Sequence, residues 1–161
     1  MKSVLFLFVA ALFVLPACAQ KSPHETVEGS DISVTYGRPY KKGRDIFGGL
    51  EPYGKVWRTG ADAATEVTFK KDGTFGGKAV KAGTYTLFTI PNATEWTVIL
   101  NSELKQWGAF SYDKNKSKDV LQFNVPAKKL DNVVEQLTIR VPSKSMIIEW
   151  DKTQITIPTS F

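Results

Sequence analysis

The chain contains 161 residues and carries a formal net charge of +5, with its lysines scattered mostly in pairs. A cationic excess this small, without a recognisable nucleic-acid-binding motif, argues against nucleic acid as a partner. Cys18 is the only cysteine, which excludes an internal disulfide and leaves packing to hold the fold together.

The first 19 residues are typical of an export signal. Lys2 precedes the apolar run Val4–Leu15, which is too short to span a bilayer, and small residues follow at 17–19. Cleavage after Ala19 predicts a periplasmic or secreted protein. The alternative is that residues 15–18 direct lipidation of Cys18 and yield an outer-membrane lipoprotein. Both alternatives predict a mature chain without a transmembrane span, because no second hydrophobic segment follows.

After a polar leader at 20–29, which we expect to be flexible, hydrophobic and polar residues alternate in short runs. Such alternation predicts β-strands. Glycine, proline, aspartate and asparagine separate the runs and predict turns. The predicted strands cover residues 32–37, 66–70, 74–80 with a turn at 76–77, 84–90, 96–101, 121–125, 137–141, 146–150 and 155–157, with connections at 126–132 and 151–152 and a short helical turn at 102–106.

Eight or nine short strands, with no amphipathic window long enough for a core helix, predict an all-β fold. We expect a single domain at residues 30–161, built as an antiparallel β-sandwich or jelly roll. A long loop at 37–63, rich in arginine and aromatic residues, follows the first predicted strand.

This loop and several later segments carry a family resemblance. The motifs are YGRP at 36–39, KGRDIFGGL at 42–50, PYGKVWRTGA at 52–61, AT at 64–65, AGTYTLFTIP at 82–91, EWTVI at 95–99, QWG at 106–108 and IEW at 148–150. The chain resembles an uncharacterised family of exported domains of unknown function, common in the Bacteroidetes group. Members often carry Asn where this chain has Asp62. The resemblance implies an exported, single-domain, mainly β protein, and it brings no assigned chemistry.

Arg38, Arg44 and Arg58 are the leading candidates for ligand binding. A guanidinium group presents a planar fork of donors that suits a carboxylate, sulfate or phosphate. Three of them on one loop predict a site for an anionic or carbohydrate-like ligand, such as an acidic sugar. The alternative is that each arginine pairs with a nearby carboxylate or loop carbonyl and fixes the loop to the sandwich. That alternative describes a structural or accessory envelope protein, which binds another envelope protein and no small molecule.

Aromatic residues of the loops extend the candidate site. Tyr40, Tyr53, Trp57 and Trp107 lie between predicted strands and could form a platform for a sugar ring, with Asp62 as an acidic neighbour. Trp96 and Trp150 alternate with polar residues on predicted strands, so we expect them in the core.

No metal or cofactor site is predicted. The segment 113–119 places oxygen-bearing side chains at alternate positions but lacks the glycine and the bidentate glutamate of a calcium loop. The only histidine, His24, lies in the leader that we expect to be flexible, and the expected mature chain has no cysteine, which argues against Ser-His-Asp and Cys-His catalysis. Whether the protein is an enzyme stays open at this point, with the balance against one. A carboxylate-dependent glycoside hydrolase, with Asp62 and Glu66 or Asp45 and Glu51 as the acid–base pair, is the remaining catalytic alternative.

Overall fold

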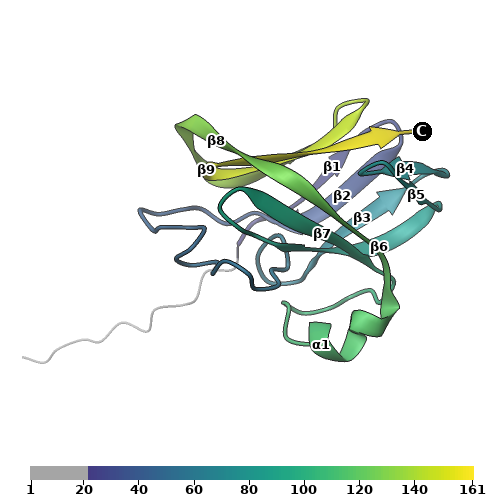
Figure 1. Ribbon diagram of the computed structural model, residues 1–161, viewed down its shortest axis with the longest axis horizontal. Helices are drawn as coiled ribbons and strands as arrows, with labels where there is room; N and C mark the ends of the chain where they lie inside the picture. Colours follow the sequence, from purple (N-terminus) through teal and green to yellow (C-terminus); the bar gives the residue numbers. More distant parts are fainter. Residues whose placement is uncertain (1–21) are drawn as a thin grey trace, which may run out of the picture.

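The computed structural model describes residues 22–161, which form an almost entirely β fold with one short α-helix (Figure 1). The expected signal sequence at 1–19 and Cys18 lie outside the described residues. The elements are β1 (His24–Glu28), β2 (Ile32–Gly37), β3 (Thr65–Phe69), β4 (Gly73–Phe75), β5 (Lys78–Val80), β6 (Gly83–Ile90), β7 (Glu95–Asn101), α1 (Tyr112–Asn115), the 3-10 turn η1 (Lys116–Lys118), β8 (Asp119–Arg140) and β9 (Ser145–Ser160).

The nine strands form one antiparallel sheet, in the order β1-β2-β3-β6-β7-β8-β9-β4-β5, and this sheet is not closed. Strand β8 belongs to two layers, because its residues up to Pro126 pair with β7 and those from Ala127 onward pair with β9. Figure 1 shows the β8–β9 pair lying across β1, β2 and β3. The predicted all-β, sandwich-like fold is therefore confirmed, with a single strand joining its two layers.

Four local expectations need correction. Part of the leader expected to be flexible forms β1, which pairs with β2, so the long loop follows the second strand of the sheet. Residues 126–132 continue β8, and residues 151–152 continue β9 through a bulge at which Asp151 has a φ of 52°. The short helix lies at 112–115, one segment later than the helical turn expected at 102–106.

The main hydrophobic core lies between the two layers. Alternate residues of β2 and β3 point into it, including Val34 and Val67, which face each other in the ladder and are fully buried. Strands β6 and β7 are buried on both faces, since Phe88 and Ile99 form a second cluster against which Tyr112 of α1 packs. This double burial explains the nearly continuous apolar run of β7.

Two aromatic residues of the long loop close one end of this core. Phe47 and Trp57 pack between Trp96 of β7 and Trp150 of β9, with ring centroids 4.6 Å apart for Phe47 and Trp96. The Trp57 and Trp150 rings stack at 6.0 Å with planes 17° apart. The loop is therefore part of the core rather than a surface appendage.

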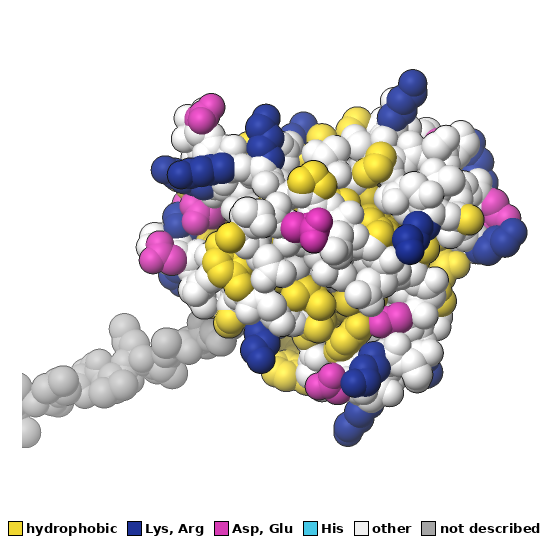
Figure 2. Space-filling model, in the orientation of Figure 1, with side chains coloured by type: hydrophobic (Ala, Val, Ile, Leu, Met, Phe, Trp, Pro, Cys, Tyr) yellow, Lys and Arg dark blue, Asp and Glu magenta, His cyan; other side chains and the backbone are white. Residues whose placement is uncertain are grey.

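Hydrophobic side chains remain exposed near the centre of one face, with basic side chains spread around them (Figure 2). Within residues 22–161, no helix has both the length and the apolar character needed to cross a membrane.

Candidate functional site

The loop at 38–64 is tied to the sheet at both ends. Trp57 N donates to the carbonyl of Thr89 in β6 at 2.7 Å, and Thr89 N donates back to Trp57 O at 3.0 Å. Where the loop returns past β2, a Cβ on Gly37 would lie only 2.0 Å from the Ala61 carbonyl oxygen, so this position accepts only glycine. The side chains between these anchors are consequently held in fixed positions.

A pocket of about 400 Å³ opens between two stretches of this loop and β9. We call residues 39–51 the outgoing arm of the loop and residues 58–62 its returning arm. Four of the predicted binding residues line it, namely Tyr40, Arg44, Arg58 and Asp62. The lining as a whole consists of Ser22, Pro23, Pro39, Tyr40, Lys42, Arg44, Leu50, Glu51, Arg58, Gly60, Ala61, Asp62 and Trp150. The fold thus brings together two of the three arginines that the sequence singled out.

Arg58 has donor capacity that the protein does not use. Its Nε is buried and has no hydrogen-bond partner among residues 22–161. Leaving a buried donor on a charged group unpaired is costly, and native structures rarely do so without a reason. The Arg58 side chain lines the pocket, so its positive charge attracts an anionic group there.

Arg44 lies on the other arm of the loop and is only partly engaged. Its Nε donates to the Lys41 carbonyl at 2.9 Å, and its Nη2 donates to the Tyr40 carbonyl at 2.5 Å. These two bonds orient the guanidinium plane, while Nη1 takes no part in them. Arg44 can therefore be held by the loop and still contact a ligand.

Glu51 is an acidic residue that lines the same pocket as Arg44 and Arg58. A tight turn places it, with Glu51 N donating to Ile46 O and Gly48 N donating to Glu51 O, both at 2.9 Å. Burial raises the pKa of Glu51 from 4.5 to about 7, although the guanidinium groups of Arg58 and Arg44 pull it in the opposite direction. Near neutral pH this carboxyl group is therefore present in both its acid and its carboxylate form.

We expect the Glu51→Gln variant to change how stability depends on pH. The folded chain holds the Glu51 proton up to about pH 7, whereas the unfolded chain releases it near pH 4.5. The wild-type protein therefore loses stability as pH rises from 4.5 through 7, and the glutamine variant lacks this loss. Melting temperatures of both proteins at pH 5 and pH 8 should show the variant gaining on the wild type at pH 8. A difference that stays constant across this range would contradict the assignment.

Of each carboxylate pair suggested by the sequence, only one member lines the pocket. Asp62 lines the pocket and accepts a hydrogen bond from Ser22 N at 3.2 Å, while Glu66 accepts one from Lys105 N at 2.8 Å outside it. Asp62 and Glu51, which come from different suggested pairs, share the pocket instead. Asp62 has a φ of 61°, a conformation that Asp and Asn tolerate better than most residues. This explains how either residue can occupy the position.

The remaining predicted site residues lie elsewhere. Arg38 is engaged through all three of its nitrogens, because it donates to Glu25 at 2.7 Å, to Leu137 O at 3.0 Å and to Thr138 Oγ1 at 3.1 Å. These contacts fix the start of the loop to β1 and β8, as the structural alternative for the arginines predicts.

The other aromatic candidates also lie away from the pocket. Trp57 is in the core and only 3% exposed. Tyr53 and Trp107 are exposed, at a different hollow and in the loop before α1 respectively. None of the three lines the pocket, so the four aromatic residues do not form one platform.

The other nine lining residues are not binding candidates by sequence, and Lys42, Leu50 and Glu51 are among them. The sequence suggests Glu51 only as a catalytic partner of Asp45. It lies midway between Arg44 and Arg58 in the sequence, but spacing has no predictive value in an irregular loop, where no period relates sequence distance to direction.

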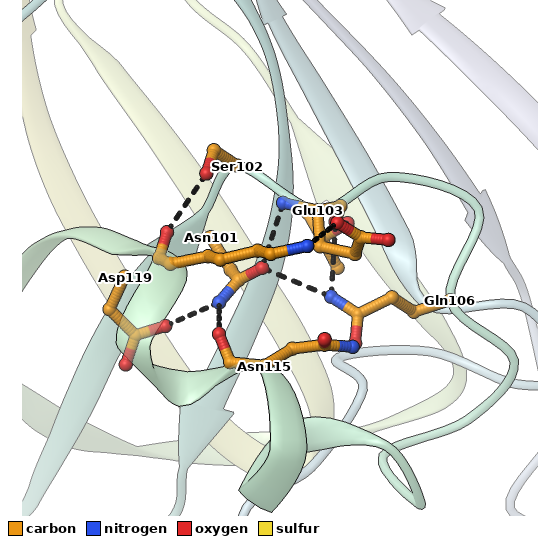
Figure 3. A network of polar contacts seen from close by, with 8 residues as sticks. Asn101, Ser102, Glu103, Gln106, Asn115 and Asp119 are labelled. Atoms are coloured by element: carbon orange, nitrogen blue, oxygen red, sulfur yellow. Dashed lines mark hydrogen bonds and ion pairs between the residues drawn. The ribbon is translucent and has the colours of Figure 1, made fainter.

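A second polar cluster lies at the C-terminal end of β7, around the buried side chain of Asn101 (Figure 3). Asn101 Nδ2 donates to Asn115 O at 2.8 Å and to Asp119 Oδ1 at 2.7 Å. Its Oδ1 accepts from Glu103 N at 2.9 Å and from Gln106 Nε2 at 3.2 Å. All hydrogen-bonding positions of this amide are thereby used within the protein, which marks the cluster as structural.

The cluster fixes residues 102–118 to the sheet. Tyr112 donates to Asp119 Oδ2 at 2.6 Å, and burial together with this carboxylate raises the pKa of Tyr112. The Asp119 carboxylate, which belongs to the segment with a calcium-like pattern, is therefore occupied by Asn101 and Tyr112. Within residues 22–161, no three His, Cys, Asp or Glu side chains gather in a metal-binding arrangement.

Comparison with protein families gives a match over residues 19–159 to the family model described as "Protein of unknown function (DUF2911)". Searches of curated proteins and of solved structures gave no match.

Proposed function

Because the chain belongs to the DUF2911 family, for which no function is known, we propose a function from the pocket itself: an exported, non-enzymatic module that binds an anionic ligand such as an acidic sugar. The observation that carries this proposal is Arg58, whose side chain lines the pocket and whose buried Nε has no hydrogen-bond partner among the described residues. A ligand carboxylate in the pocket would pair with the charge of this guanidinium through its terminal nitrogens, because Nε itself has no accessible surface.

The other walls of the pocket favour a carboxylate on a sugar-like body. Arg44 and Lys42 add positive charge on the opposite arm, while Tyr40 and Leu50 provide exposed aromatic and apolar surface. A volume of about 400 Å³ falls in the range of small-molecule sites. A monosaccharide acid or the end of a uronic-acid chain matches this combination of charge, surface and size.

The proposed location is outside the cytoplasm, in the periplasm, on the outer membrane or in the medium. The supporting evidence is the export pattern at residues 1–19, which lies outside the described residues. The intact mass of the protein purified from cell envelopes distinguishes cleavage after Ala19 from lipidation of Cys18.

The Arg58→Gln variant tests the binding proposal. A uronic-acid trisaccharide titrated into the wild-type protein should bind, and its neutral methyl ester should bind much more weakly, because the ester lacks the charge that the guanidinium groups recognise. Removing Arg58 should weaken trisaccharide binding by about ten- to a hundred-fold, the effect of losing charge-assisted hydrogen bonds. Isothermal titration calorimetry measures both effects.

Arg140→Gln is the matched control, since it removes the same charge from an exposed ion pair with Glu149 on the sheet surface. This variant should bind the trisaccharide as the wild type does. Binding should also tighten as pH falls through 7, because protonation of Glu51 removes a negative charge beside the ligand. A folded Arg58→Gln variant that binds as tightly as the wild type would overturn the proposal.

A second candidate, a carboxylate-dependent glycoside hydrolase, rests on one observation. Glu51 has the raised pKa of a general acid, and it shares the pocket with a second carboxylate, Asp62. The titrated trisaccharide can be examined for new reducing ends by mass spectrometry. Cleavage that disappears in Glu51→Gln would favour this candidate, and an intact trisaccharide would leave binding as the function.

A further inference from the structure

A second hollow, separate from the arginine pocket, is surrounded by lysines. It has a volume of about 210 Å³ and lies between the bend of β8 and β9 and the loop segment around Tyr53. Its lining consists of Tyr53, Ala93, Ala127, Lys128, Lys129, Lys152 and Thr153. All three lysines thus line a concave surface whose lining contains no acidic residue. Lys128 and Lys152 share one face of the β8–β9 pair, because Lys128 pairs with Gln154.

The carboxylates closest to these lysines in the sequence are engaged elsewhere. Asp151, next to Lys152, forms an ion pair with Lys41 at 3.1 Å. Glu135 of β8 accepts a hydrogen bond from Lys42 N at 2.8 Å. Asp131 lies on β8 but does not line the hollow. Most ion pairs of the described residues contain a lysine, yet none of these lysines is Lys128, Lys129 or Lys152. Within residues 22–161, these three lysines therefore form no ion pair of their own.

The walls of this hollow are held in place by the backbone. Ala127 N donates to Thr94 O at 2.8 Å, which joins β8 to the turn between β6 and β7. Gly54 N donates to Pro91 O at 2.9 Å, which fixes the loop beside the same turn. The Tyr53 ring lies over Gly48, where a Cβ would come within 2.8 Å of it. A site whose walls are already ordered loses little entropy when a ligand binds.

We propose that this hollow binds a phosphate or sulfate group. Lysine acts as a point charge with three rotatable donors, and it binds tetrahedral oxyanions without the planar match that arginine offers a carboxylate. Like charges around one hollow repel each other, and a multiply charged anion removes that repulsion. The small volume suits one such group with its waters rather than a whole saccharide. The site therefore differs in ligand class from the arginine pocket.

The experiment compares two triple variants with the same change of charge. One replaces Lys128, Lys129 and Lys152 by Gln; the other replaces Lys78, Lys114 and Lys144, which are exposed and lie outside both hollows. Inorganic pyrophosphate is titrated at constant ionic strength and followed by amide NMR shifts. The wild type and the control variant should show saturable shifts at residues 127–129 and 152–153. The variant that lacks Lys128, Lys129 and Lys152 should bind pyrophosphate at least tenfold more weakly.

Two further arms identify the source of the anion and keep the two sites apart. Sedimentation with phosphatidylglycerol vesicles, but not with phosphatidylcholine vesicles, in a manner that needs the three lysines would identify a lipid headgroup. Saturable pyrophosphate binding without vesicle binding would identify a free phosphate or sulfate compound. Arg58→Gln should keep pyrophosphate binding at the lysines. Shifts that do not saturate, or that weaken equally in both triple variants, would overturn the proposal.

Discussion

Trp57→Ala is expected to lower the free energy of unfolding by about 3–5 kcal/mol, the usual cost of removing a large buried aromatic side chain. Trp57 packs against Phe47, Trp96 and Trp150, and its indole Nε1 donates to Gly60 O at 3.2 Å. The alanine variant leaves a cavity in this cluster and frees the returning arm of the loop. Urea unfolding followed by far-UV circular dichroism measures the loss.

Trp107→Ala provides the matched control for this prediction. Trp107 is the same residue type in another loop, but it is 59% exposed, against 3% for Trp57. Its replacement should change stability by less than about 1 kcal/mol, because little buried apolar surface is lost. Equal losses in the two variants would show that the loop aromatics do not complete the core.

Asn101→Ala is expected to cost about 3 kcal/mol, because it leaves several buried donors and acceptors without partners. The amide joins β7 to Asn115, Asp119, Glu103 and Gln106, and alanine replaces none of these four bonds (Figure 3). Residues 102–118 should then detach more readily than the rest of the sheet. Thermal unfolding measures the stability, and limited proteolysis detects cleavage within 102–118.

Asn124→Ala is the control for this second variant. Asn124 also bonds two side chains, Glu95 at 2.8 Å and Thr97 at 3.0 Å, but it lies on the exposed face of β8. Water can replace both partners there, so the expected loss is within about 0.5 kcal/mol. An Asn101→Ala variant as stable and as protease-resistant as Asn124→Ala would contradict the structural role of the cluster.

Alternation of apolar and polar residues predicted most of the strands correctly, because side chains of a half-buried strand alternate between core and solvent. It failed for β1, in which four of the five residues are polar or charged, as is common at a sheet edge. It also divided β8 and β9 at Pro126 and at residues 151–152. Both positions resemble turns, yet a long strand that crosses between layers must bend and carry bulges at such points.

The grouping of the candidate residues could be predicted in part. The composition of the loop singles it out, and four of its candidate residues meet in one pocket. Arg38 and Trp57 could not be told apart from Arg58 and Tyr40 by sequence, because partner choice in an irregular loop depends on tertiary contacts. The lysine hollow was harder still, since Lys128 and Lys152 lie on different strands and meet only through the register of β8 and β9.

The insertion of Phe47 and Trp57 into the core has a consequence for how ligands are recognised. A loop that contributes to the core cannot swing open without exposing the rings it buries, so the arginine pocket has no inexpensive open state. If the pocket binds a ligand as proposed, we expect lock-and-key recognition: encounter rates would depend on electrostatic attraction and access, and selectivity on the fixed shape of the cavity.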